Sequence, residues 1–212
     1  MAGWKVPGAT PKGSLSGPSE VWPPWSEAYI GGVSGSDADD RELLLPPSAL
    51  AHLRRAFRKE GSALGAVHAF HDAGFATGAA VFEQLSRRFG PEPSGSSETT
   101  FWREFTAFFR ATGWGDLTHK RVHPGLAILR SNNWSESDPS SGDTQPGCAF
   151  TSGVLAHLLG RVAGGPIAVL EVGCRSKGDR ECSFVFGSEG AIHDLYGLLL
   201  DGAPLETALQ RM

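Results

Sequence analysis

Apolar residues recur at helical spacing in separate stretches of the chain. Leu50, Leu53 and Phe57 lie on one face of a helix predicted over residues 49–57, with Ser48 as its N-cap. A second helix is predicted over about residues 62–89. Its many glycines and alanines allow a neighbouring helix to approach closely, and Gly74 is a point at which this helix could break.

The middle of the chain carries a strong aromatic periodicity. A helical stripe is formed by Phe101, Phe105, Phe108 and Phe109. Such a stripe is typical of a helix packed in a core, and it could equally line a pocket for a flat hydrophobic ligand. Two further helices are predicted, an apolar one over residues 149–162 and a last one over about residues 190–200.

Four short strand-like runs complete the pattern, over residues 117–122, 126–131, 167–172 and 183–186. The first two are joined by the turn signal His123-Pro124-Gly125. Because each pair is joined too tightly for a helical crossover, the strands should pair as antiparallel hairpins. The predicted fold class is therefore α+β, with a small antiparallel β-sheet of two hairpins packed against helices.

Composition divides the chain into two parts. Residues 1–45 combine many Pro, Gly and Ser with an acidic run, which predicts a flexible N-terminal tail. Residues 46–212 are predicted to form one folded domain. The tail also carries four aromatic residues, which docking on the domain surface or on a partner would explain: Trp4, Trp22, Trp25 and Tyr29.

Charge and hydropathy narrow the classes of function. Nineteen basic against 23 acidic residues give a net charge of −4, so a nucleic-acid partner is not expected. The chain has no run of about 18 apolar residues and no apolar signal core at its start, so no membrane span is expected. Three sparse cysteines are unlike a secreted disulfide scaffold and favour a cytoplasmic protein with reduced thiols.

The three cysteines and one glutamate form a candidate metal site. Cys148, Glu171, Cys174 and Cys182 follow one another at C-x22-E-x2-C-x7-C spacing. Thiolates and a carboxylate suit zinc, and four protein ligands leave no open position for an activated water, so the ion would be structural. The alternatives are a disulfide between Cys174 and Cys182, or three unrelated buried thiols. His157 and Asp179 are candidate substitute ligands.

The same region resembles the 4-vinyl reductase domain family. The resemblance lies in three stretches of sequence: Gly147-Cys-Ala-Phe-Thr-Ser-Gly-Val-Leu-Ala156, Val169-Leu-Glu-Val-Gly-Cys174 and Gly178-Asp-Arg-Glu-Cys-Ser-Phe184. It implies helices around a small antiparallel sheet, often as a dimer, in a fold related to transport-protein-particle subunits and haem nitric-oxide-binding domains. In the aromatic-responsive sensors of this family a structural zinc is held by Cys, Glu, Cys and Cys, and the four residues named above match those positions.

The resemblance also implies a ligand pocket between the helix before the first hairpin and the sheet. The sensors fix a phenol hydroxyl with a His and a Trp, and Trp134 could match that Trp. No histidine occurs between Phe101 and Trp114, where the other anchor is expected, so a more apolar ligand fits better. The expected ligand-binding residues are Phe101, Phe105, Phe108, Phe109 and Trp134.

Catalytic signatures are absent from the sequence. It contains no G-x-G-x-x-G, G-x-x-x-x-G-K, G-x-S-x-G or H-E-x-x-H, so no catalytic residue is expected. The leading hypothesis is a stand-alone sensor or carrier of a small hydrophobic or aromatic molecule, a homodimer that signals to a protein partner. The alternatives are an accessory role in 4-vinyl reduction of a tetrapyrrole, as in bacteriochlorophyll synthesis, and a dimeric structural adaptor.

Overall fold

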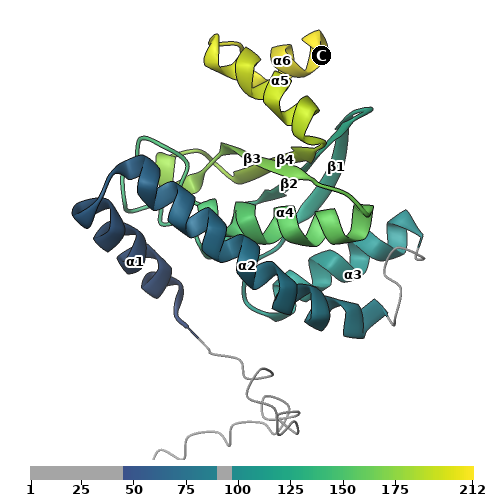
Figure 1. Cartoon of the computed structure of the whole chain (residues 1–212), viewed down its shortest axis with the longest axis horizontal. Helices are drawn as coiled ribbons and strands as arrows, with labels where there is room; N and C mark the ends of the chain where they lie inside the picture. The colour runs from purple at the N-terminus through teal and green to yellow at the C-terminus, as the bar shows by residue number, and fades with distance from the viewer. Residues whose placement is uncertain (1–44, 90–96) are drawn as a thin grey trace, which may run out of the picture. The chain divides into compact units, whose positions relative to one another are not determined.

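The computed structural model describes residues 45–89 and 97–212 (Figure 1). Apart from Leu45, the tail predicted over residues 1–45 lies outside the described residues. The described elements are, in chain order, α1 (Pro47–Glu60), α2 (Ala63–Phe89), α3 (Glu98–Ala111), β1 (Thr118–His123), β2 (Leu126–Ser131), α4 (Ala149–Ala163), β3 (Ala168–Gly173), the 3-10 turn η4 (Arg175–Lys177), β4 (Cys182–Gly187), α5 (Glu189–Leu200) and α6 (Leu205–Arg211).

The four strands form one sheet in the order β1-β2-β4-β3, and every neighbouring pair is antiparallel. The two predicted hairpins, β1-β2 and β3-β4, therefore join through their second strands. Ile128 of β2 pairs with Val185 of β4, and Ser131 pairs with Cys182. The α+β class predicted from the hydrophobic pattern is confirmed, because both strand pairs are closed by connections without an α-helix.

Successive residues of the central strands enter two different cores, as the alternation of a strand requires. Leu129 and Phe184 pack among residues of α2, α3 and α4 on one face of the sheet. Ile128 and Val185 pack against α5 and α6 on the other. Figure 1 shows α4 along one face of the sheet, with α5 and α6 beyond the opposite face. The sheet is thus covered by helices on both sides.

The small residues of α2 allow a close contact with α4, as the sequence predicted. A Cβ atom added at Gly74 would lie 2.0 Å from the backbone oxygen of Phe150. A Cβ added at Gly153 of α4 would lie 2.0 Å from the backbone oxygen of His71. The helix backbones therefore approach too closely for any side chain at these positions. Gly74 serves this packing, and α2 runs through it without the break that its sequence allowed.

The first helix differs from its prediction in its start and in its buried face. Ser48 is not the N-cap: the helix begins one residue earlier, because Pro47 suits the first helical turn, where no backbone N–H is needed. The expected apolar face is also wrong, since Leu53 and Phe57 are 48% and 49% exposed. Ala51 and Arg54 are buried instead. A short final helix, α6, was not predicted at all.

Candidate metal centre

Three elements bring the four predicted ligands together. Cys148 is the N-cap of α4, Glu171 lies in β3 with Cys174 just after that strand, and Cys182 begins β4. One ligand atom from each residue lies within 4.8 Å of all the others. The Cys148 Sγ lies 3.9 Å from the Sγ of Cys174 and 3.9 Å from that of Cys182. The sequence spacing thus becomes a single cluster that could hold a metal ion.

The alternatives to this cluster fit the structure less well. All three cysteines are free and fully buried, and the two Sγ distances from Cys148 are far above the length of a disulfide bond, about 2 Å. Neither His157 nor Asp179 belongs to the cluster. Asp179 instead accepts a hydrogen bond from the backbone N–H of Cys174, at 2.8 Å. The ring of His157 packs against Phe75, between α4 and α2.

Backbone donors point at the ligand atoms. The Cys148 N–H donates to Glu171 Oε2 at 2.8 Å, and the Gly147 N–H donates to the Cys174 Sγ at 3.3 Å. Such donors favour anionic thiolates and carboxylates. Glu171 Oε1 is buried and has no hydrogen-bond partner among the described residues. An orphaned carboxylate oxygen beside three thiols is the donor set that a thiophilic cation completes, so these residues fit a metal ion.

The acidic groups of the cluster compete for protons. Hydrogen bonds from the thiols of Cys148 and Cys174 lower the pKa of Cys182 to about 4. The pKa of Cys148 is raised, first because its thiol proton is shared with Cys174, and the pKa of Glu171 is raised by burial. Without a cation, only part of the cluster can be ionised at neutral pH. A bound dication would hold all four groups deprotonated.

A buried glutamate supports the centre, and the sequence did not reveal it. Glu136 is 1% exposed, and its carboxylate accepts from the backbone N–H of Phe150 at 3.1 Å and of Thr151 at 2.7 Å. It also accepts from the Thr151 hydroxyl. Glu136 therefore caps the N-terminus of α4, where the side chain of Cys148 makes no capping bond. Burial raises the pKa of Glu136 to about 7. Only its place in a polar loop before an apolar helix hinted at this role.

The predicted aromatic ligand-binding residues come together in one cluster. Trp134, Phe101, Phe105, Phe108 and Phe109 are all buried in the core between α3, α4 and the sheet. The ring centroids of Phe105 and Phe109 are 5.0 Å apart, and those of Phe109 and Trp134 are 5.6 Å apart. The Trp134 indole N–H donates to the Thr151 hydroxyl at 2.8 Å. The polar atom that would anchor a phenol is thus already engaged within the core.

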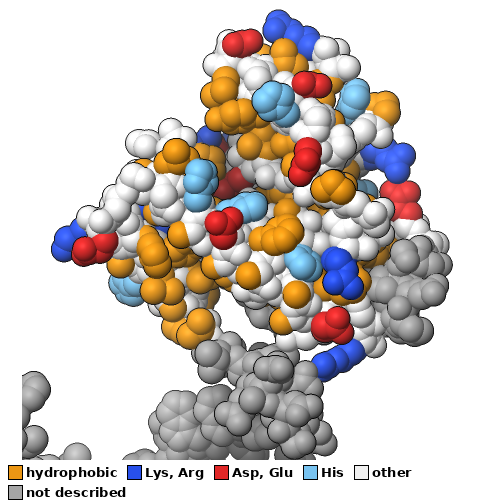
Figure 2. All heavy atoms as spheres, viewed as in Figure 1, with side chains coloured by type: hydrophobic (Ala, Val, Ile, Leu, Met, Phe, Trp, Pro, Cys, Tyr) orange, Lys and Arg blue, Asp and Glu red, His pale blue; other side chains and the backbone are white. Residues whose placement is uncertain are grey.

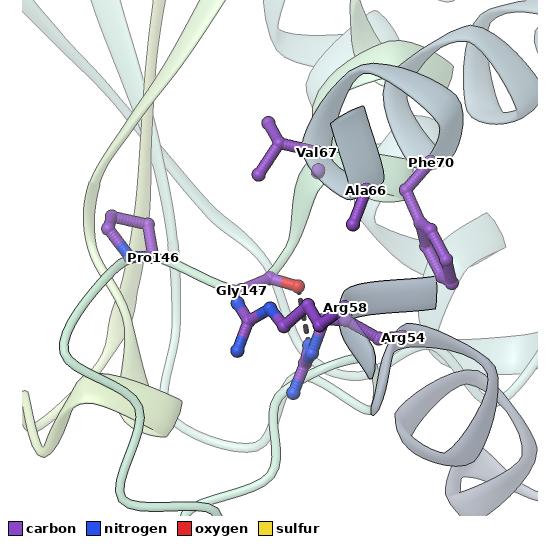
Figure 3. Close-up of a pocket in the computed structure, with 8 residues that line it drawn as sticks. Arg54, Arg58, Ala66, Val67, Phe70, Pro146 and Gly147 are labelled. Atoms are coloured by element: carbon purple, nitrogen blue, oxygen red, sulfur yellow. Dashed lines mark hydrogen bonds between the residues drawn. The ribbon is translucent and has the colours of Figure 1, made fainter. Parts of the chain in front are cut away.

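The two cavities that we describe lie elsewhere. One, of about 10 Å³, lies between α1, α2 and the start of α4, and Figure 3 shows Arg54, Arg58 and Gly147 around it. The other is an open groove of about 470 Å³ beside α5 and α6, lined by His193 and Asp201 among others. No helix among the described residues is both long and apolar enough to cross a membrane.

Comparison with known proteins places the chain among related folds. One similar structure is the phenol-responsive sensory domain of the transcription activator PoxR with phenol, at a TM-score of 0.57 and 18% identity, covering 77% of this chain and 85% of that one. A trafficking protein particle complex subunit 3 from Naegleria fowleri, covalently bound to palmitic acid, has a TM-score of 0.55 and 11% identity, covering 66% and 91%.

A third structure is a vinyl-4-reductase family protein from Methanocaldococcus jannaschii, with a TM-score of 0.45 and 17% identity, covering 70% of this chain and 84% of that chain. The comparison with curated proteins gave no match. At the level of sequence, residues 138–188 match the model of the 4-vinyl reductase domain, and this segment holds all four residues of the metal cluster. Residues 138–188 are therefore a 4-vinyl reductase domain, and the resemblance of the chain to that family is confirmed.

Proposed function

We propose that this protein senses or carries a small hydrophobic or aromatic molecule, and that a structural zinc ion stabilises its ligand-binding domain, residues 46–212. The observation that carries the proposal is the closed cluster of Cys148, Glu171, Cys174 and Cys182, which packs against the aromatic core. We also propose that the protein acts in the cytoplasm, where its three thiols would stay reduced.

The choice of zinc rests on the ligand set. Three thiolates and one carboxylate suit this borderline-soft ion, and four protein ligands complete a tetrahedron. When bound, zinc would supply cross-linking and charge neutralisation, not a reactive water. Its ligands would tie the N-terminus of α4 to β3 and β4, to which the Cys148–Glu171 hydrogen bond already connects it.

The ligand proposal rests on the aromatic cluster and on two similar folds. The PoxR sensory domain is described with phenol and the trafficking subunit with palmitic acid, so this fold accommodates small hydrophobic molecules in other proteins. We place the ligand among Phe101, Phe105, Phe108, Phe109 and Trp134. Because Thr151 already accepts from the Trp134 N–H, a ligand without a hydroxyl group is favoured. The buried side chains would have to move to admit it.

Native mass spectrometry of the purified full chain, with elemental analysis, tests this function. The expected result is one zinc per chain and a retained hydrophobic molecule of low mass. Metal-free protein, after purification with reductant and without chelator, would contradict the zinc site. A visible absorbance band from a bound pigment would favour the tetrapyrrole hypothesis, and a dimer that takes up no hydrophobic compound would favour the adaptor.

We further propose that the protein is a homodimer that passes its signal to a protein partner. Large apolar side chains are exposed on α1 and α2, and Figure 2 shows hydrophobic side chains gathered over these helices. They include Leu53, Phe57, Leu64, Val67 and Phe75. Contiguous exposed apolar surface of this kind marks interaction sites on proteins. A second copy of the chain would cover it in a symmetric, self-complementary contact.

A further inference from the structure

We infer that Arg54 of α1 is a positioning residue for the metal centre, so that metal binding and the docking of α1 stabilise each other. The inference rests on the proposed metal site and concerns a helix that lies outside the matched domain of residues 138–188. It begins from an anomaly of α1, in which an arginine is buried while two large apolar residues of the same helix are half exposed.

Arg54 is held by the backbone of the segment that leads into α4. Its Nη1 donates to the backbone oxygen of Gly147 at 2.5 Å and to that of Glu136 at 3.5 Å. Its Nη2 forms an ion pair with Asp143 at 3.3 Å. Figure 3 shows the guanidinium reaching from α1 to Gly147. With a side chain only 7% exposed, this arginine cannot leave its partners without leaving a buried charge unpaired.

Gly147 connects Arg54 directly to the metal ligands. It immediately precedes Cys148, and its own N–H donates to the Cys174 Sγ at 3.3 Å. The carbonyl on one side of this residue thus faces the arginine, while the N–H on the other side faces a ligand sulfur. A Cβ at this position would lie 2.8 Å from Arg54 Nη1 and 3.3 Å from Ser176 Oγ, so only glycine fits between them.

A second connection runs through Asp143 and Ser176. Asp143 accepts from Arg54 and also from Arg58, the latter at 2.6 Å, while its own N–H donates to the backbone oxygen of Ser176 at 3.0 Å. Ser176 lies in the turn that follows Cys174, and its hydroxyl accepts from the Asp138 N–H at 2.8 Å. The loop before α4 is therefore held between the arginines of α1 and the turn that carries a metal ligand.

Electrostatics give this arrangement a direction. Four anionic ligands outweigh one dication, so the loaded centre would be net negative, and a buried guanidinium nearby lowers the cost of that charge. Few other contacts hold α1: its buried residues are Ala51 and Arg54, and Phe57 makes an edge contact with Phe70. A centre that loses its metal would loosen the loop, and with it the main attachment of α1.

Zinc affinity of the full chain tests the positioning role. Competition between the protein and a chromophoric chelator is measured for the wild type, for Arg54→Gln, for Arg54→Lys and for the control Arg55→Gln. Arg55 lies on the same helix and pairs with Asp138, but it is largely exposed. We expect Arg54→Gln to weaken zinc binding about tenfold or more, as loss of a residue that orients a metal ligand does. Arg54→Lys, which keeps the charge, should lose less, and Arg55→Gln should change affinity less than about twofold.

Hydrogen exchange of the wild type tests the linkage without any substitution. Zinc removal should speed amide exchange in α1 by at least about tenfold while leaving α5 unchanged, because coupling between two sites is reciprocal. Equal affinities for the Arg54→Gln and Arg55→Gln variants, or α1 exchange that ignores zinc, would overturn the inference while the zinc site stands. A wild-type chain that binds no zinc would overturn both.

Discussion

Each residue of the candidate metal centre is fixed by a neighbour that the sequence separates widely from it. Glu171 accepts from the backbone of Cys148, 23 residues earlier, and Gly147 donates to the sulfur of Cys174. These contacts orient the ligand atoms before any ion arrives. Replacement of a single ligand should therefore remove the ion without rearranging the rest of the centre.

The first prediction concerns Cys174→Ser. A hydroxyl is a poor zinc ligand, so this variant should lose the metal and several kcal/mol of stability, equal to a fall of roughly 5–15 °C in melting temperature for a domain of this size. Differential scanning calorimetry measures it, with chelator-treated wild type as the control that should melt close to the variant. An unchanged melting temperature would show that the centre does not stabilise the fold.

The second prediction concerns Glu136, whose pKa is raised by burial from 4.5 to about 7. A folded-state pKa above the unfolded value means that the neutral form is favoured in the fold, so stability is fully present below about pH 4.5 and is lost as pH rises through 7. From pH 5.5 to 8 the wild type should lose about 2 kcal/mol more than Glu136→Gln. Urea unfolding at both pH values measures this difference, in which the shared titration of the cysteines cancels. Parallel losses in the two proteins would contradict it.

At the scale of elements, the contact between α2 and α4 depends on glycine. Both helices were predicted from their periodicity, and the small residues of α2 indicated a close neighbour. The sequence did not identify α4 as that neighbour, because the register between two helices depends on how the sheet between residues 118 and 187 places them. The prediction for α1 failed for a similar reason. Periodicity selected its apolar face, yet the polar loop before α4 offers carbonyl groups that hold Arg54 inside.

The third prediction compares two Gly→Ala substitutions in helices. At Gly153 the added methyl group would lie 2.0 Å from the backbone oxygen of His71, so α2 must shift, and we expect a loss of about 1–3 kcal/mol. At Gly197 of α5 no atom lies within 4 Å of the added carbon, and alanine should stabilise the helix by up to about 1 kcal/mol. Chemical denaturation of the two variants should give changes of opposite sign. A stable Gly153→Ala variant would mean that α2 and α4 pack less closely than described.

At the scale of the whole molecule, the described domain keeps two separate cores, one on each face of the sheet, and leaves apolar side chains exposed on α1 and α2. The proposed dimer accounts for this surface. It would also bring the helix that Arg54 attaches to the metal centre into the dimer interface, so that loss of metal would weaken the dimer.

The fourth prediction tests the dimer with matched leucines. Leu64 of α2 and Leu200 of α5 are 64% and 68% exposed, so a glutamate at either position costs the monomer little. Leu64→Glu should shift the protein to monomer in sedimentation velocity experiments, and Leu200→Glu should leave it dimeric. A wild type that sediments as a monomer, or two variants that behave alike, would remove the proposed interface.

The sequence by itself determined the elements and the ligand set. Periodicity and turn residues predicted the α+β class with two hairpins, and the spacing of Cys148, Glu171, Cys174 and Cys182 pointed to one metal site, because these signals are local or depend on residue type alone. Only the tertiary structure decided that Glu136 caps α4, that Trp134 gives its N–H to Thr151, and that Arg54 turns inward to Gly147. Those roles arise from contacts between distant segments, where burial makes a donor or a carboxylate depend on whichever partner the fold brings within reach.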